Sequence, residues 1–214
     1  MKPSARSSIR HRAIASIVLA CLGCGVYLLS LSGRAPSASK PTSNGKSVVD
    51  VICSTADLAV FCKVIQSATR SPHVARLMDP QLHATVFAPT DRAFNEDEAR
   101  LGQLLGVSGL AQLLTSPRVA AELVASHVIT DHIVKEAQLL QERLFHNLLG
   151  HTLEVDASTL DGGLHIRGPA SSVRLCSGPA PQVPLQASAS IIYRVEGVLA
   201  ARFPALPSFR AAMR

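Results

Sequence analysis

The chain has 214 residues, 47% of them hydrophobic, so it can bury one good core but not two full-size domains. The formal net charge of +6 comes from residues 1–46, which carry basic side chains and no acid, while the rest is close to neutral. With no Trp and few other aromatic residues, this distribution argues against nucleic-acid binding.

An uncharged apolar segment, 13–31, follows a short basic region at 1–12 and is long enough to cross a hydrocarbon core as a helix. We interpret it as a signal anchor in the membrane or, if it is cleaved, as a signal peptide. A lipoprotein signal ending at Cys21 and a plastid transit peptide fit less well. Cys21 and Cys24 are then ordinary membrane-helix residues or an acylation site. This interpretation puts 1–12 in the cytoplasm and the C-terminal domain outside the cell or in a lumen, as a single-pass membrane protein or a secreted one.

A segment rich in Ser, Pro and Gly, 32–47, comes next and is typical of a flexible tether. We place one folded domain over 48–202 and a C-terminal tail over 203–214. No internal repeat is present, so a single copy of the domain has to be stable by itself.

The first half of the domain has helical periodicity. Ser54 and Asp57 have the spacing of a capping box, and Leu58, Phe61 and Ile65 recur behind them at helical intervals. This pattern predicts an amphipathic helix that begins at Ser54.

A strand and further helices follow. The β-rich run 84–88 is closed by Pro89, after which Thr90 or Asp91 can cap a helix. Beyond a Leu-rich stretch, the Ser-Pro pair that opens 116–126 supplies an N-cap and a first-turn proline. We therefore expect a helix after the strand, and helical structure through the Leu-rich stretch to about Ser126.

Short runs of β-branched residues fill the second half, separated by Gly, Pro, Asp and Ser. The predicted strands are 127–134, 152–155, 164–166, 173–175 and 190–195. Helices gathered early and strands late indicate an α+β fold rather than an alternating parallel sheet.

The order of these pieces resembles a fasciclin domain, an extracellular adhesion module. Residues 85–94 (TVFAPTDRAF) nearly reproduce the first motif of that family, and 127–129 (HVI) and 191–199 (IIYRVEGVL) follow in its order. The resemblance implies a fasciclin-type fold, a β-wedge or sandwich with helices largely from the N-terminal half. The structural residues that it implies are Thr85, Phe87, Pro89, Thr90, Asp91, Phe94, His127, Val195, Val198 and Leu199.

Two positions depart from the family pattern. Ser126 stands where the family commonly has Tyr before the central His, and 193–196 reads Tyr, Arg, Val, Glu where His, Val, Ile, Asp is usual. We therefore do not carry over a receptor contact of the Tyr-His pair to this chain.

The resemblance also implies a disulfide between Cys53 and Cys62, as in some algal members of the family. On one straight helix their Cα atoms would lie about 13 Å apart, beyond the roughly 7 Å limit for a bridge. A disulfide therefore requires the chain to turn at Ser54-Thr55. Cys176 is left over, and it either is buried or links two chains.

The most enzyme-like cluster is Ser126-His127 with Asp131 and His132. Adjacent side chains on a strand point to opposite faces, and His127 and Asp131 would lie about 13 Å apart on it. We expect no catalytic residues, and interpret His127 as a partly buried histidine that is hydrogen-bonded near the first motif and joins helix to sheet.

No metal or cofactor site is predicted. Five histidines lack the spacing of a preformed zinc site, and 96–98 (EDE) reads as a solvated helix face rather than a calcium loop. The histidines concerned are His127, His132, His146, His151 and His165.

Two functions remain. The first is an adhesion or matrix module that binds a protein or glycan at the cell surface, with homo-association left open and the contact residues unknown. The second is a small-molecule or lipid carrier with a cavity between helices and sheet. An enclosed apolar pocket of several hundred Å³ would favour the carrier, whereas an exposed apolar patch on a filled domain would favour adhesion. The resemblance favours adhesion.

Overall fold

The computed structural model describes residues 45–157, 163–176 and 183–201 and shows an α+β fold. The predicted basic region, the segment 13–31, most of the predicted tether and the tail 203–214 lie outside the described residues. Among the helices that are described, none combines the length and the hydrophobicity needed to span a bilayer.

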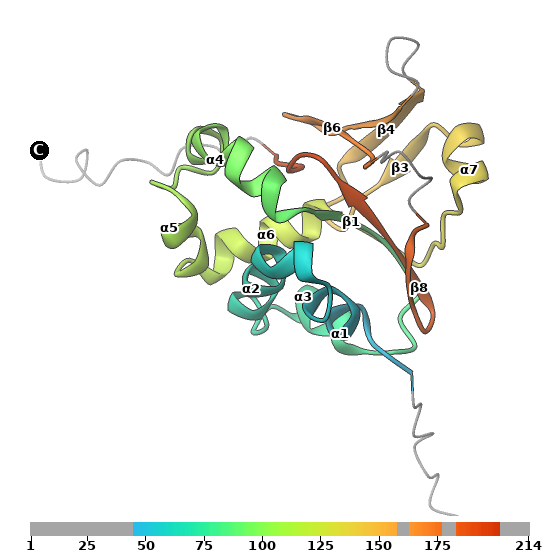
Figure 1. Ribbon diagram of the computed structural model, residues 1–214, viewed down its shortest axis with the longest axis horizontal. Coiled ribbons are helices and arrows are strands. Elements are labelled where there is room, and N and C mark those ends of the chain that lie inside the picture. Colours follow the sequence, from blue (N-terminus) through green and yellow to red (C-terminus); the bar gives the residue numbers. More distant parts are fainter. Residues whose placement is uncertain (1–44, 158–162, 177–182, 202–214) are drawn as a thin grey trace, which may run out of the picture. The chain divides into compact units, whose positions relative to one another are not determined.

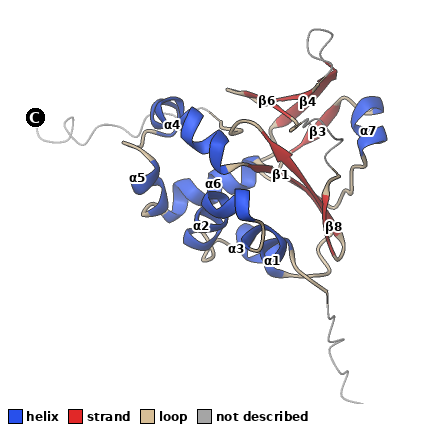
Figure 2. Cartoon of the chain, in the orientation of Figure 1, coloured by secondary structure: helices blue, strands red, loops and turns tan. Residues whose placement is uncertain are grey.

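The helices α1 to α6 gather on one side of a mixed sheet, and α7 lies apart from them, next to the strands (Figures 1 and 2). Two short 3₁₀ turns, η1 (Ala56–Leu58) and η2 (Arg76–Met78), interrupt the first half. The helices are α1 (Val48–Cys53), α2 (Ala59–Ser67), α3 (Pro72–Ala75), α4 (Asp91–Leu105), α5 (Leu110–Leu114), α6 (Pro117–Ser126) and α7 (Glu136–Gln141).

Two four-stranded sheets make up the strand layers. The first has the order β2-β1-β8-β7, in which β1 and β8 are parallel neighbours although they lie far apart in sequence. The second has the order β3-β4-β5-β6 and is antiparallel throughout. The strands are β1 (Ala84–Pro89), β2 (Val128–Thr130), β3 (Leu144–His146), β4 (Thr152–Ala157), β5 (Leu164–Arg167), β6 (Ser172–Arg174), β7 (Leu185–Ala187) and β8 (Ser190–Val195).

The first sheet separates two cores because side chains alternate along β1 and β8. Val86 and Ile192 point into the core shared with α1 to α6. Phe87 and Tyr193, one residue further along, point into the core shared with the second sheet and α7. Both faces of the central strands are therefore buried, which explains their continuous apolar sequence.

The prediction that a helix begins with a capping box at Ser54 is wrong. The capping box lies at Ser47, whose side chain accepts a hydrogen bond from the backbone of Asp50, and Ser54 instead ends α1. The Ser54 hydroxyl donates to the Val51 carbonyl, 3.0 Å away, and α2 begins only after η1. Ser47 is buried, so the fold starts slightly before the boundary expected at Val48.

The strand predicted over 127–134 is shorter than expected. Only β2 is extended, because Asp131 adopts a positive φ of 61° and turns the chain. The strands β3 and β7 and the helix α7 were not predicted, since three-residue strands and a six-residue helix carry too little periodicity to recognise.

Candidate interaction site

The first motif ties β1 to the segment between β2 and α7 through Thr85. Its hydroxyl accepts a hydrogen bond from the Val134 backbone N–H and donates one to the His132 carbonyl, each 2.8 Å long. Phe87 is fully buried and its ring stacks on Tyr193, with 6.0 Å between ring centroids. Both side chains therefore contact other parts of the fold and are not available to a partner at the surface.

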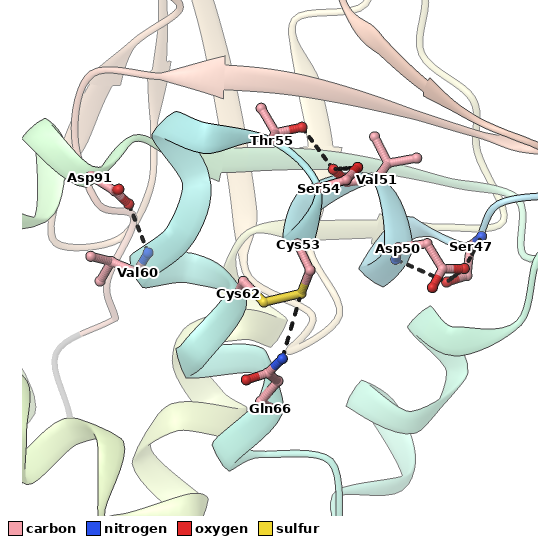
Figure 3. The surroundings of a disulfide bond; sticks show 10 residues. All are labelled: Ser47, Asp50, Val51, Cys53, Ser54, Thr55, Val60, Cys62, Gln66 and Asp91. Atoms are coloured by element: carbon pink, nitrogen blue, oxygen red, sulfur yellow. Dashed lines mark hydrogen bonds between the residues drawn. A yellow bond between two sulfur atoms is a disulfide. The ribbon is translucent and has the colours of Figure 1, made fainter.

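The second half of the motif fastens α4 to α2. Thr90 is the N-cap of α4, and its side chain accepts from the Ala93 N–H at 3.2 Å. Asp91 accepts from the Val60 N–H at 2.7 Å, near the start of α2 (Figure 3). Pro89, which closes β1, and Phe94 are also buried. This second half of the motif thus lies at the junction of β1 with the helices.

Cys53 and Cys62 form a disulfide, with 5.1 Å between their Cα atoms (Figure 3). The chain turns at Ser54-Thr55, between the end of α1 and η1, as the bridge required. Cys53 is exposed, and Cys62 is buried against the helical core. The bridge therefore fastens a short surface helix to a buried one.

His127 is fully buried at the end of α6, rather than partly buried as expected. Its Nε2 accepts a hydrogen bond from the Leu199 N–H at 2.9 Å, so the ring proton is on Nδ1, which donates to the Leu123 carbonyl at 2.8 Å. The ring also packs on Phe61, and the His127 carbonyl accepts from the Phe87 N–H. Burial lowers the pKa of His127 to about 4, which keeps the ring neutral at physiological pH. The expected link between helix and sheet is present.

The enzyme-like cluster does not assemble. Ser126 Oγ and His127 Nδ1 lie 3.1 Å apart, so the expectation that these side chains point apart is wrong: both residues belong to the end of α6 and not to a strand. Nδ1 already carries the ring proton, and Ser126 Oγ lies 2.7 Å from the Leu199 carbonyl. The pair is buried, and His127 has no vacant nitrogen to take a proton from the hydroxyl.

The other two members of that cluster lie on the surface. Asp131 is 3.8 Å from the guanidinium of Arg76, and His132 is 3.6 Å from Glu142. Among the described residues, no three His, Cys, Asp or Glu side chains are placed to hold a metal ion.

The end of the described chain is anchored to α4, which the sequence did not reveal. Val195, Val198 and Leu199 are buried. Asp97 accepts from the Val198 N–H at 2.8 Å, and Arg100, paired with Asp97 at 2.6 Å, donates to the Val198 carbonyl. The expectation that all of 96–98 is solvated is thus wrong for Asp97. Its only sequence signal is an Asp-Arg pair at i and i+3, which is common on exposed helix faces.

The described part of the molecule is well filled. A hollow of about 580 Å³ is an open groove on the outer face of α4, and two further hollows have about 10 Å³ each. The groove is lined mainly by polar side chains: Asn95, Glu96, Glu98, Ala99, Gly102, Gln103, Val107 and Ser108. None of these three hollows is an enclosed apolar cavity of several hundred Å³.

Two exposed leucines flank the turn between α7 and β3. Leu140 is 53% exposed and Leu144 is 64% exposed. Two further large apolar side chains, Met78 and Val183, are exposed elsewhere. Leu140 lies near the end of α7 and Leu144 opens β3, so both put apolar side chains into solvent where the chain passes from this helix to the second sheet.

Cys176 is half-buried just after β6, so it is less buried than one alternative predicts, and the link between two chains stays a prediction. Burial, with a smaller contribution from Glu196, raises the pKa of its thiol to about 11. The thiol is therefore protonated at neutral pH, and a protonated thiol is a poor nucleophile.

Comparison with known proteins gives one family. The sequence profile of the Fasciclin domain matches residues 57–200. No curated protein matches the chain. Among solved structures it is similar to a FAS1 domain pair from the insect cell adhesion molecule fasciclin I, with a TM-score of 0.56 and 12% sequence identity. The similarity covers 72% of this chain and 50% of that structure, so the chain spans about half of its length. At this identity the similarity concerns the fold.

Proposed function

The chain belongs to the fasciclin-domain family, and from this premise we propose that it is an adhesion module that binds a partner through its surface. The observation that supports this most directly is the filled interior combined with exposed leucines at the corner of α7 and β3. Apolar side chains that stay in water cost free energy until a partner covers them. Of the two partner classes considered, a protein fits leucines better than a glycan, whose surface is mainly polar.

A carrier function has less support. Pockets for small molecules and lipids are mostly apolar and cover most of the ligand. The groove on α4 is open and lined mainly by polar groups, and the hollows beside the cores have about 10 Å³ each. A lipid would therefore find no apolar enclosure in the described part of the chain.

Catalysis also has little support. The one adjacent Ser-His pair is buried, and the lone pair of His127 Nε2 is occupied by the Leu199 N–H. A general base needs an accessible lone pair within reach of a substrate proton. We therefore propose that the domain works by binding alone.

The family and the disulfide together indicate an extracellular or secreted location, because disulfides persist in oxidising compartments. We extend the proposal to the N-terminal region, with 13–31 as a signal anchor and the following Ser- and Pro-rich segment as the tether. Carbonate extraction of membranes, followed by N-terminal sequencing, is expected to recover a chain that retains 13–31 in the membrane fraction. A mature N-terminus after residue 31 would show that 13–31 is a cleaved signal peptide and not an anchor.

The adhesion proposal is tested with beads that carry the full chain. They are mixed with cells, and uncoated beads mixed with the same cells serve as the reference. We expect attachment to exceed that of uncoated beads. The double substitution Leu140→Asp and Leu144→Asp should reduce attachment about fivefold, because buried apolar anchors carry most of the binding energy of an interface.

The matched control is Met78→Asp, which puts the same charge on another exposed apolar residue and should leave attachment unchanged. Circular dichroism checks that all variants are folded. Equal attachment of the double variant and the wild type would contradict the assignment of this corner. Equal attachment of wild-type and uncoated beads would contradict adhesion itself.

A further inference from the structure

The groove on the outer face of α4 has an acidic character that the adhesion proposal does not use. Glu96 and Glu98 are exposed on its wall, and none of its lining residues is Lys or Arg. Glu96 lies 3.3 Å from Arg92, but both side chains are largely exposed, and such a pair is weak and screened by salt. Glu98 accepts only a long bond, 3.3 Å, from the Leu110 N–H. The groove therefore suits an occupant that carries positive charge.

The described chain ends close to this groove. Val198 is fixed to α4 by Asp97 and Arg100, and Figure 1 shows this last segment running up to α4. Arg100 and Glu96 are four positions apart and so are neighbours on the helix surface. An extended chain covers about 3.3 Å per residue, so a few residues beyond Ala201 are enough to pass from Arg100 to the groove.

The sequence that follows has the complementary charge. Residues 202–214 contain Arg202, Arg210 and Arg214 and no acidic residue, together with Phe203, Leu206 and Phe209. Guanidinium groups bind carboxylates through charge-assisted, often bidentate hydrogen bonds. The apolar side chains can cover the Val107 and Ala99 part of the groove.

From the groove, its charge and the end of the anchored chain, we infer that residues 202–214 dock in the groove on α4 of the same molecule, with their arginines paired to Glu96 and Glu98. Covalent attachment gives a tail of this length an effective concentration in the millimolar range. The tail can therefore occupy the groove of its own chain even if the same contact between separate molecules would be weak. High salt weakens it, because the paired charges lie near the surface.

The test is amide hydrogen exchange of peptides from 95–108, measured in the full chain. We expect exchange in this region to be about threefold or more slower in the wild type than in a variant with Arg202→Glu, Arg210→Glu and Arg214→Glu. The double substitution Glu96→Arg and Glu98→Arg should also remove the protection of 95–108 from exchange. A variant that combines this pair with the three Arg→Glu substitutions should restore the protection at least in part, because the charges are then complementary again. Dilution of the wild type should not change the protection, because the contact is intramolecular.

The matched control is Glu136→Arg with Glu142→Arg, which reverses two exposed charges on and beside α7 and should leave exchange in 95–108 unchanged. Equal exchange in the wild type and in the Arg→Glu variant would overturn the proposal. Protection that falls on dilution would also overturn it, since the tail would then occupy the groove of a second copy. These readouts do not involve attachment to cells, so they stand or fall independently of the adhesion proposal.

Discussion

Replacing Cys53 by Ser and Cys62 by Ala is expected to lower the free energy of unfolding by about 2–3 kcal/mol. The two cysteines are nine positions apart in sequence, and the value is the conformational entropy that closing a loop of this size removes from the unfolded chain. Without the bridge, α1 is held by its cap at Ser47 and by its packing on α2, β7, η1 and η2. The loss should therefore appear first as faster hydrogen exchange in α1. Urea unfolding followed by circular dichroism measures the stability, since the chain has no Trp for fluorescence.

Two controls isolate the bridge. Cys176→Ser removes a thiol that is not part of it and should change the stability by less than about 0.5 kcal/mol. Reducing the wild type with a small thiol should give the same loss as the double substitution. If the double variant and the wild type unfold at the same urea concentration with the same slope, the bridge does not stabilise the fold as argued.

The stability of the chain is also expected to fall with acid through His127. The pKa of this ring is about 4 in the folded protein and 6.5 in the unfolded chain, because burial disfavours the charged form. Above pH 6.5 neither state is protonated and the full stability is present. As the pH falls from 6.5 to about 4, the unfolded chain takes up the proton first, so the free energy of unfolding decreases, by roughly 3 kcal/mol in total.

The structural consequence of protonation is specific. A proton on Nε2 would face the Leu199 N–H, so the bond that holds the end of β8 and the following segment against α6 would be lost. We expect the variant His127→Gln, which keeps a neutral polar side chain, to be less stable at pH 7.5 but to lose less stability than the wild type on going to pH 4.5. Urea unfolding at both values measures this difference. The same loss in both proteins would rule out His127 as the acid-sensitive group.

Local signals in the sequence were enough for several elements. The β-rich run before Pro89 is β1, the Ser-Pro pair starts α6, and the predicted strand 190–195 coincides with β8. The family motif predicted the fold and the disulfide, and both are confirmed. In each case the information lies in neighbouring residues, through side-chain periodicity, a cap or a motif.

Where two local signals had the same spacing, no local pattern distinguished the one that forms the cap. Both Ser47 with Asp50 and Ser54 with Asp57 have capping-box spacing, and only the first forms the cap. The second pair is drawn into other contacts: Ser54 bonds back to α1, and Asp57 lies 3.4 Å from Arg194 of β8. The second of these contacts involves a residue more than a hundred positions away, which no local pattern contains.

The sequence by itself therefore determined the longer elements and their order, the family and, through the resemblance to it, the cysteine pair. The tertiary structure alone decided the parallel pairing of β1 with β8, the burial of His127 against Leu199, the fixing of Val198 by Asp97 and Arg100, and the acidic groove beside them. The physical reason is range. Helices and turns are set by interactions among neighbours, whereas these features arise where segments distant in sequence are brought together to bury a common core.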